Sequence, residues 1–456
     1  MDTCECVAVL ELLARTTIDL TQDMVSHGSP PLPLETRMRM ACTSFEYSEL
    51  GIKAPLTGST VHVPDVGRAV HAILLRIRHS MEWRAAARAL KPLTKNKIEL
   101  DHTLEVFCHR LMLPVLGRKD LKALSPRQAA TAAVQAIGGQ PVEYRASALL
   151  QGFLVLEKPL AFEVDQSRVN IRPTTAEDMT YDVPEFSLTE RPHLFSRPTA
   201  LLTAARPALG PNALQSLVSA VVSALRLFNL CSASIQTIRF DADAGTGLAG
   251  LGVVHTQRPR HTRYTCAIAA QDAERLEAFV PRLYPLLPRS ATKRHHDDPI
   301  SIALSRYEHS ILDADTLDEQ VLGATMALEA VLLGGDEKQE LGFKLSCRAA
   351  RLLASFGADP VAVKNCVKKA YQVRSRYVHG GVSTPKSKAS LAKNYGTEDR
   401  FTREVLNTTR QVLVTTILAQ QSKDAFLRTL DSALIASQPG SFDEKMHELE
   451  QWVRRP

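Results

Sequence analysis

A helix that ends in two glycines constrains the C-terminal half of the chain more than any other feature. From Val363 to Val378, apolar residues recur at spacings of three and four, the pattern of an amphipathic helix packed on a neighbour. Gly380-Gly381 follows, and glycine readily takes the left-handed conformation that terminates a helix. Arg374 lies on the apolar side, where an unpaired buried charge is costly. We therefore expect Arg374 to be paired, to extend towards solvent, or to face a cleft or partner subunit.

The charge distribution favours an anionic partner for this part of the chain. The 456 residues carry a net charge of +6, and the basic surplus is concentrated between Lys364 and Arg410. Such a run is either a solvated basic face or a track for a phosphate backbone. In the second case, the residues predicted to contact the phosphate backbone are Lys364, Lys368, Arg376, Lys386 and Lys388.

Other motifs give no support for a cofactor or metal. The eight cysteines form no CxxC pair and no zinc-spaced array with histidine, which favours a reduced cytoplasmic protein. Residues 245–250 match G-x-G-x-x-G, but a strand-like run follows them where a dinucleotide site needs a helix, so we interpret them as a loop. Residues 293–298 contain adjacent histidines and acids that we interpret as a linker. No apolar run is long enough to span a membrane.

Hydrophobic periodicity predicts a mainly α protein with a central α+β region and a C-terminal helical bundle. We expect three domains: a helical N-terminal domain at 1–140, an α+β domain at 141–295 and a bundle at 296–456. Short apolar runs between turn residues predict antiparallel strands. These strands are expected at residues 148–156, 160–164, 169–171, 234–240, 251–256 and 264–269.

Helical patterns fill the two ends of the chain. Near the N-terminus we expect an amphipathic helix around Val7–Ile18 and one long helix over Val66–Leu90. Asp359-Pro360 is a helix start signal. Residues 382–395 are predicted as a polar basic loop. Further helices are predicted at residues 127–137, 212–228, 273–280, 301–312, 317–333, 337–356, 360–379, 401–421 and 423–435.

An arginine and a histidine at the end of one helix suggest RNA cleavage. Attack by the RNA's own 2′-hydroxyl needs a proton acceptor, a cation for the phosphate and a proton for the departing 5′-oxygen. Histidine can exchange protons near neutral pH, and arginine can bind two phosphate oxygens. Arg374 and His379 lie five residues apart, about 140° around an ideal helix. One helix therefore does not direct both to one phosphate, unless its end frays or a second subunit faces it.

A structural role for the same two residues remains the alternative. Glu329 is the carboxylate beyond the first turn of the predicted helix 317–333, which makes it the expected partner of Arg374 or of Arg348. In this interpretation His379 is a helix-terminal cation favoured by the helix dipole.

Three segments in sequence order resemble a known family. They read MALEAVLL at 326–333, ELGFKLSCRAARLL at 340–353 and AYQVRSRYVHG at 370–380. They resemble the Apea-like branch of the HEPN superfamily (higher eukaryotes and prokaryotes nucleotide-binding). The similarity extends upstream through 224–228 and 304–307, and so covers roughly residues 200–420.

The resemblance implies an all-α bundle that forms a homodimer, with the arginine-to-histidine motif of each subunit facing a two-fold cleft. Active members are metal-independent endoribonucleases that leave a 2′,3′-cyclic phosphate, commonly in toxin, abortive-infection and anti-phage systems. Arg374 and His379 then become the catalytic residues, with Ser375, Glu329 and Tyr371 in support. Ser375 departs from the Asn, Asp or His that often follows the arginine.

Two functions follow as hypotheses. In the first, the bundle is a ribonuclease regulated through its N-terminal domains by an activating ligand or a phage protein. In the second, it is a non-catalytic HEPN bundle that dimerises and binds RNA or protein.

Overall fold

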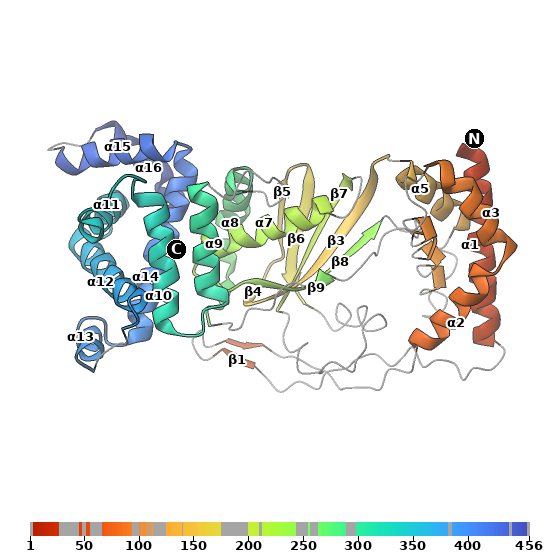
Figure 1. Cartoon of the computed structure of the whole chain (residues 1–456), viewed down its shortest axis with the longest axis horizontal. Helices are drawn as coiled ribbons and strands as arrows, with labels where there is room; N and C mark the ends of the chain where they lie inside the picture. Colours follow the sequence, from red (N-terminus) through yellow and green to blue (C-terminus); the bar gives the residue numbers. More distant parts are fainter. Residues whose placement is uncertain are drawn as a thin grey trace. The chain divides into compact units, whose positions relative to one another are not determined.

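The computed structural model describes most of the chain (Figure 1). The described residues are 3–26, 45–47, 52–54, 66–93, 100–112 except 102, 106, 109 and 110, 125–174 except 139, 199–208, 212–242, 254–255, 263–288, 298–381, 385–436 and 440–453. They are mainly helical and include a central region of strands, as predicted. Two compact units result: one contains residues 1–149, 166–218 and 236–256, and the other contains 150–165, 219–235 and 257–456. The three predicted domain ranges stay predictions.

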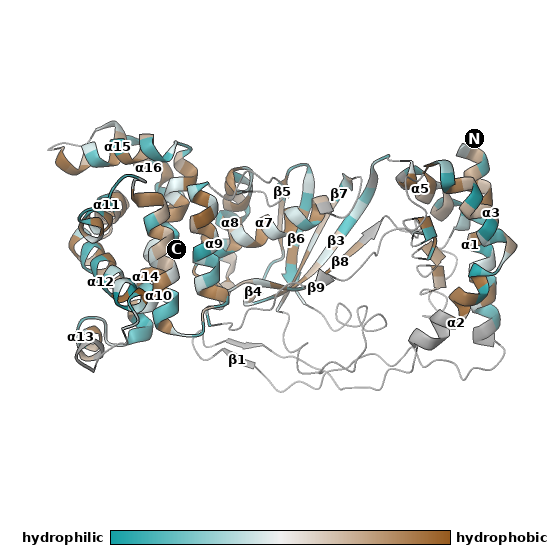
Figure 2. Ribbon diagram, in the orientation of Figure 1, coloured by the Kyte–Doolittle hydropathy of each residue, from teal (hydrophilic) through white to brown (hydrophobic). Residues whose placement is uncertain are grey.

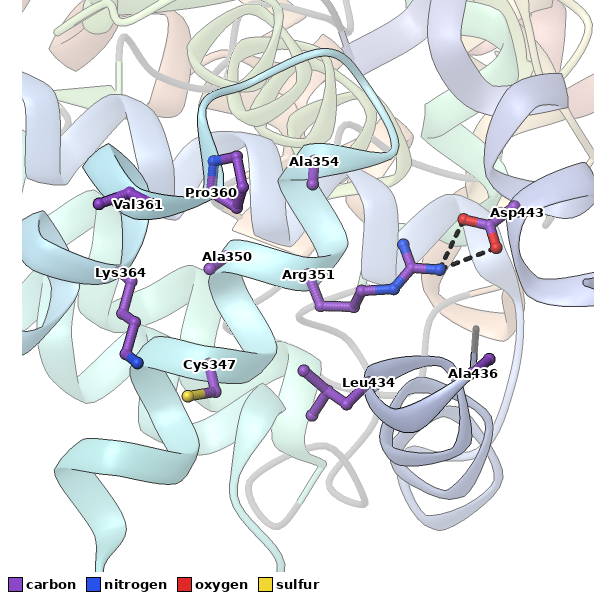
Figure 3. Close-up of a pocket in the computed structure, with 10 residues that line it drawn as sticks. All are labelled: Cys347, Ala350, Arg351, Ala354, Pro360, Val361, Lys364, Leu434, Ala436 and Asp443. Carbon is purple, nitrogen blue, oxygen red and sulfur yellow. Dashed lines mark hydrogen bonds and ion pairs between the residues drawn. The ribbon is translucent and has the colours of Figure 1, made fainter. Parts of the chain in front are cut away.

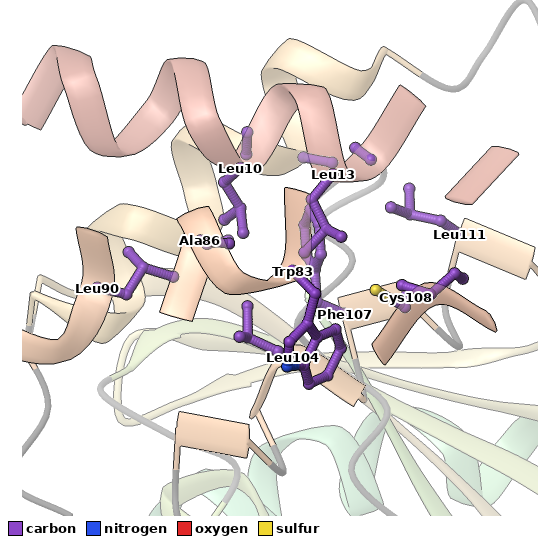
Figure 4. Packing of buried hydrophobic residues seen from close by; sticks show 14 of the residues in the cluster. Leu10, Leu13, Trp83, Ala86, Leu90, Leu104, Phe107, Cys108 and Leu111 are labelled. Atoms are coloured by element: carbon purple, nitrogen blue, oxygen red, sulfur yellow. The ribbon is translucent and has the colours of Figure 1, made fainter. Parts of the chain in front are cut away.

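The N-terminal helices of the first unit share one hydrophobic core. Leu10 and Leu13 are buried against Trp83 and Phe107 (Figure 4). Hydrophobic and hydrophilic residues alternate along the ribbon of the first helix (Figure 2), because only one of its faces meets this core. The helices are α1 (Thr3–Ser26), α2 (Val66–Arg78), α3 (Met81–Leu90), the 3-10 turn η1 (Lys91–Leu93) and α5 (Pro126–Ile137).

The single helix predicted over residues 66–90 is wrong, since the structure has α2 and α3 there. Ser80 interrupts the run, and its hydroxyl accepts a hydrogen bond from the backbone N–H of Trp83 at 3.1 Å. In one continuous helix, the N–H of Trp83 would donate to the carbonyl four residues earlier. The Ser80 hydroxyl accepts this hydrogen bond instead, so a new helix begins after Ser80. Periodicity does not register such a break, because the apolar spacing carries on across it.

The strands of the first unit follow the order β6-β7-β3-β8-β9. Antiparallel pairing joins β6 to β7, with Pro173 opposite Ala200, and joins β8 to β9, with Ile238 opposite Val254. The antiparallel pair β1 (Phe45–Tyr47) and β2 (Ile52–Ala54) also lies in this unit. The bounds are β3 (Val142–Gln151), β6 (Ser167–Pro173), β7 (Ala200–Ala208), β8 (Ser234–Ala242) and β9 (Val254–His255).

The strands of the second unit correct two predictions. The run 148–156 is divided at Gly152, which has a φ of +74° and leaves no room for a Cβ, since that atom would lie 2.8 Å from the Ser232 carbonyl oxygen. Beyond it, β4 (Phe153–Val155) pairs with β10 (Cys266–Ile268) in parallel, whereas antiparallel strands were expected. The remaining strand, β5 (Leu160–Val164), contacts α8 (Ala270–Leu283), which the turn η4 (Tyr284–Leu286) follows.

A helical bundle forms the larger part of the second unit. Its central member, α10, contacts α9, α12 and α14, which agrees with its apolar sequence. Buried Arg410 donates two hydrogen bonds to the last carbonyls of α7 (Asn212–Phe228), at Leu227 (2.9 Å) and Phe228 (3.0 Å). The bundle helices are α9 (Pro299–Leu312), α10 (Leu317–Leu332), α11 (Leu341–Ala354), α12 (Pro360–Val378), α13 (Pro385–Tyr395), α14 (Glu398–Ala419), α15 (Lys423–Ile435) and α16 (Ser441–Val453).

The loop predicted at residues 382–395 is wrong for most of its length, because α13 occupies 385–395. Leu391 is buried, and the Tyr395 ring lies 4.9 Å from that of Phe401. Two apolar anchors in a basic segment give too weak a periodic signal to predict a helix. The last helix, α16, was not predicted.

Two sequence motifs lie outside the described residues: the glycine motif at 245–250 and residues 293–297 of the linker. Within the described ranges, no helix combines the length and apolar character needed to cross a membrane.

Candidate functional site at the end of helix α12

Local signals at both ends define α12, as the sequence predicts. Asp359 caps the start, where its carboxylate accepts a hydrogen bond from the backbone N–H of Val361 at 2.9 Å. At the other end Gly380 has a φ of +73°, and the N–H of Gly381 donates to the carbonyl of Arg376 at 2.9 Å. The buried face consists of Val363, Cys366, Val367, Ala370 and Val373.

Arg374 lies at the edge of this buried face and is held on two sides. Its Nη2 lies 3.2 Å from Oε2 of Glu329 on α10, and its Cζ lies 5.9 Å from the centre of the Tyr371 ring. The arginine side chain keeps 27% of its surface exposed, and the glutamate side chain keeps 18%. Of the two arginines expected as partners of Glu329, the structure therefore selects Arg374. The buried Nε of Arg374 has no hydrogen-bond partner among the residues that the structure describes.

Glu329 is a carboxylate in a partly apolar setting. Burial raises its pKa, while the charge and hydrogen bond of Arg374 oppose that rise. The ion pair therefore opposes the effect of burial on this carboxyl and holds the guanidinium at the helix edge.

Tyr371 is positioned by a glycine on the neighbouring helix. A Cβ added to Gly342 of α11 would lie 2.7 Å from Cδ1 of the tyrosine ring, well inside normal contact. The ring thus packs directly on the backbone of α11 and fixes the surface on which the Arg374 guanidinium rests.

His379 lies at the exposed C-terminus of the same helix. Its backbone N–H donates to the Ser375 carbonyl at 3.3 Å, with φ −89° and ψ 17°. Within the described part of the chain, no side chain forms an ion pair or hydrogen bond with its imidazole. Ser375 is half-buried one turn earlier. The structure thus brings Arg374, Glu329 and Tyr371 together, and it leaves His379 apart from them.

Tyr377 links the last turn of α12 to the first turn of α10. Its hydroxyl donates to Oε1 of Glu319 at 2.9 Å, and this hydrogen bond lowers the pKa of that carboxyl. Tyr377 and Val378 are nevertheless 38% and 54% exposed. The histidine is therefore flanked by apolar surface that nothing in the described chain covers.

The predicted RNA contacts have different surroundings. Lys364 is half-buried with Nζ 5.2 Å from the centre of the Phe343 ring, Lys368 is exposed, and Arg376 is half-buried near Gly381. The side chains of Lys386 and Lys388 lie outside the described residues, although both belong to α13.

Sequence reasoning missed an ion-pair cluster centred on Arg348 of α11. Arg348 donates to both carboxylate oxygens of Glu337 and of Asp431, and to the Leu332 carbonyl at 2.8 Å. Asp431 follows Arg348 by 83 residues, so no local spacing connects them. The apolar face of α11 with an arginine at its centre is the signal that could have drawn attention to the site.

Among the described residues, no three histidine, cysteine or acidic side chains are placed to hold a metal ion together. Comparisons of the chain with family models, with curated proteins and with solved structures give no match.

Proposed function

We propose that this protein is a metal-independent endoribonuclease of the HEPN type. The observation that carries the proposal is the end of α12, where a half-exposed Arg374 rests on Glu329 and Tyr371 and an exposed His379 follows on the last turn. The three sequence segments that resemble the HEPN superfamily, which contain these same residues, give further support.

The chemistry transfers two protons and needs one cation. The 2′-oxygen attacks the adjacent phosphorus while a base accepts its proton, and the bond from phosphorus to the 5′-oxygen breaks as that oxygen receives a proton. The products are a 2′,3′-cyclic phosphate and a 5′-hydroxyl. His379 exchanges protons with either oxygen, and Arg374 donates hydrogen bonds to the phosphate oxygens. Glu329 and Tyr371 position Arg374.

A second copy of the chain completes the site in this proposal. Arg374 and His379 differ by about 140° around the helix, so two facing helices would supply the groups that one does not direct to a single phosphate. The exposed side chains of Tyr377 and Val378 provide apolar surface beside the histidine for such a contact. A homodimer through the C-terminal bundle is therefore part of the proposal.

The basic residues of α12 and α13 supply the RNA-binding surface. Lys364, Lys368, Arg376, Lys386 and Lys388 would hold the phosphate backbone through salt-dependent contacts. The N-terminal region would restrain the nuclease until an activating ligand or a phage protein binds, as in toxin, abortive-infection or anti-phage systems.

The test is cleavage of end-labelled RNA by the full-length protein in EDTA. We expect cleavage that leaves a 2′,3′-cyclic phosphate and that both Arg374→Ala and His379→Ala reduce at least 100-fold, within the range of general acid–base contributions. His309→Ala is the matched control, because His309 is also an exposed histidine near a helix end, on α9. Circular dichroism and sedimentation velocity check that the variants fold and dimerise.

A non-catalytic bundle that dimerises and binds RNA or protein is the second candidate. The ion pair between Arg374 and Glu329 favours it, because a purely structural arginine would make the same contact. Dimerisation and RNA binding by the folded full-length chain, without cleavage of the bound RNA, would establish this function in place of the nuclease.

A further inference from the structure

A groove of about 550 Å³ opens on the second unit, between α11, the start of α12 and the end of α15 (Figure 3). Its floor is one face of α11, formed by Cys347, Ala350 and Ala354. Its walls come from the start of α12, at Val361, and the end of α15, at Leu434. The volume lies within the range of about 300–1,000 Å³ that small-molecule sites occupy.

The shape of the groove follows from small side chains at helical spacing. Residues 347, 350 and 354 lie on the same side of α11 and form a trough about 10 Å long at 1.5 Å rise per residue. Above the trough, Val361 is 63% exposed and Leu434 is 39% exposed. An apolar chain along the trough would remove this surface from water at about 25 cal/mol for each Å².

The two cations that line the groove differ in how far neighbouring acceptors neutralise their charge. Arg351 is fully engaged: its Nη2 donates to both carboxylate oxygens of Asp443, at 2.7 and 2.8 Å, and its Nε donates to the Ala433 carbonyl at 2.9 Å. Lys364, by contrast, has its Nζ over the Phe343 ring and no carboxylate within ion-pair distance in the described chain. The groove thus combines an apolar floor with one uncompensated positive charge.

We infer that this groove binds an amphipathic monoanion of the alkyl carboxylate class. The alkyl chain lies along the α11 trough between Val361 and Leu434, and the carboxylate accepts a hydrogen bond from the Lys364 ammonium. A single carboxylate balances a single ammonium, whereas a polyanion would place further charges against an apolar floor. The site goes beyond the proposed RNA cleavage and requires neither RNA nor a second copy.

Calorimetric titration of the full-length protein with dodecanoate, below its micelle concentration, tests the inference. We expect saturable binding of one dodecanoate per chain. Lys364→Glu and Val361→Asp should each weaken it at least tenfold, because the first places a negative charge beside the carboxylate and the second places one against the alkyl chain. Lys368→Glu is the matched control, since Lys368 is one turn further along α12, is exposed and does not line the groove. Dodecanol should bind at least tenfold more weakly than dodecanoate.

Two results would overturn the inference. One is the absence of saturable dodecanoate binding to the folded wild-type protein. The other is equal weakening by Lys364→Glu and Lys368→Glu, which would indicate general attraction to a basic helix. Since binding is measured without RNA, its outcome is separate from the fate of the nuclease proposal.

Discussion

Arg348 and Glu337 form a two-point ion pair in which Nη1 donates to Oε2 at 2.7 Å and Nη2 donates to Oε1 at 2.9 Å. The arginine side chain is only 6% exposed, and it also binds Asp431. One cation therefore ties α11 to the segment before it and to α15. The cluster therefore gives α11 and α15 a shared electrostatic contact.

Removing this cation should strongly destabilise the protein. We expect Arg348→Met to lower the free energy of unfolding by about 3 kcal/mol, because two partly buried carboxylates lose their partner. Lys344→Met is the control: Lys344 binds the same Glu337 at 3.0 Å but is 38% exposed, so its loss should cost less than about 1 kcal/mol. Denaturant unfolding measures both. Equal costs would contradict the importance given to Arg348.

Acid should weaken the same cluster. The hydrogen bonds from Arg348 are the largest cause that lowers the pKa of Glu337 from 4.5 to about 2. A carboxyl whose pKa is lower in the folded state stabilises the fold above its unfolded pKa and loses that contribution as pH falls through the folded pKa. We expect unfolding free energy to fall between pH 4.5 and 2, and less steeply in Glu337→Gln. Parallel pH profiles of the two proteins would refute the assignment.

Position 342 should not accept a side chain, because the Tyr371 ring packs directly on the Gly342 backbone. Gly342→Ala places a Cβ 2.7 Å from the tyrosine ring, and we expect a cost of about 1–3 kcal/mol from overpacking. Gly335→Ala is the control, because nothing lies within 4 Å of its added Cβ. The double variant with Tyr371→Ala should show a favourable coupling free energy in a double-mutant cycle. Additive effects would show that the ring does not meet the glycine.

Glycine at position 380 should matter for its backbone conformation alone. Its φ is +73° and its added Cβ would meet nothing within 4 Å, so Gly380→Ala should cost about 1 kcal/mol through left-handed strain. Gly440→Ala, also in open space, has no positive φ and should not destabilise the protein by this mechanism. Thermal unfolding compares the two, and an unchanged midpoint for Gly380→Ala would argue against this helix end.

Neutralising Glu329 should show whether this carboxylate serves RNA cleavage by positioning Arg374 or only stabilises the fold. Glu329→Gln keeps the shape of the side chain and removes the charge that holds Arg374. Burial raises the pKa of Glu329, so acid protonates this carboxyl and weakens its hold on Arg374. We therefore expect lower RNA cleavage in the variant and a shallower loss of cleavage in acid. Unchanged cleavage with an unchanged pH profile would remove Glu329 from the site.

Local signals made several helices of the chain predictable. The predicted bounds of α7, 212–228, and of α15, 423–435, agree with the structure to the residue. The start of α12 at Pro360 follows from the Asp359 cap, and its end follows from the glycine at 380. The sequence predicted that Glu329 pairs with Arg374 or with Arg348, because a carboxylate and a cation on two apolar faces each need a partner, and the structure selects Arg374.

Features set by distant contacts were not predictable in the same way. The break at Gly152 depends on the close approach of Ser232, and the choice of Asp431 by Arg348 depends on how α15 packs. The cap at Ser80 was locally visible, but an uninterrupted apolar period concealed it. Periodicity shows which face of a segment is buried. The break at Gly152 and the partner of Arg348 depend instead on which distant residue packs against that face.

The hydrogen bonds from Arg410 to the end of α7 set an order in which the protein can mature. The carbonyls of Leu227 and Phe228 receive their donor from a residue more than 180 positions later. During synthesis, a ribosome must therefore add most of the remaining sequence before the second unit can close around α7. Until Arg410 has been synthesised, these two carbonyls lack the side-chain donor that the folded unit gives them.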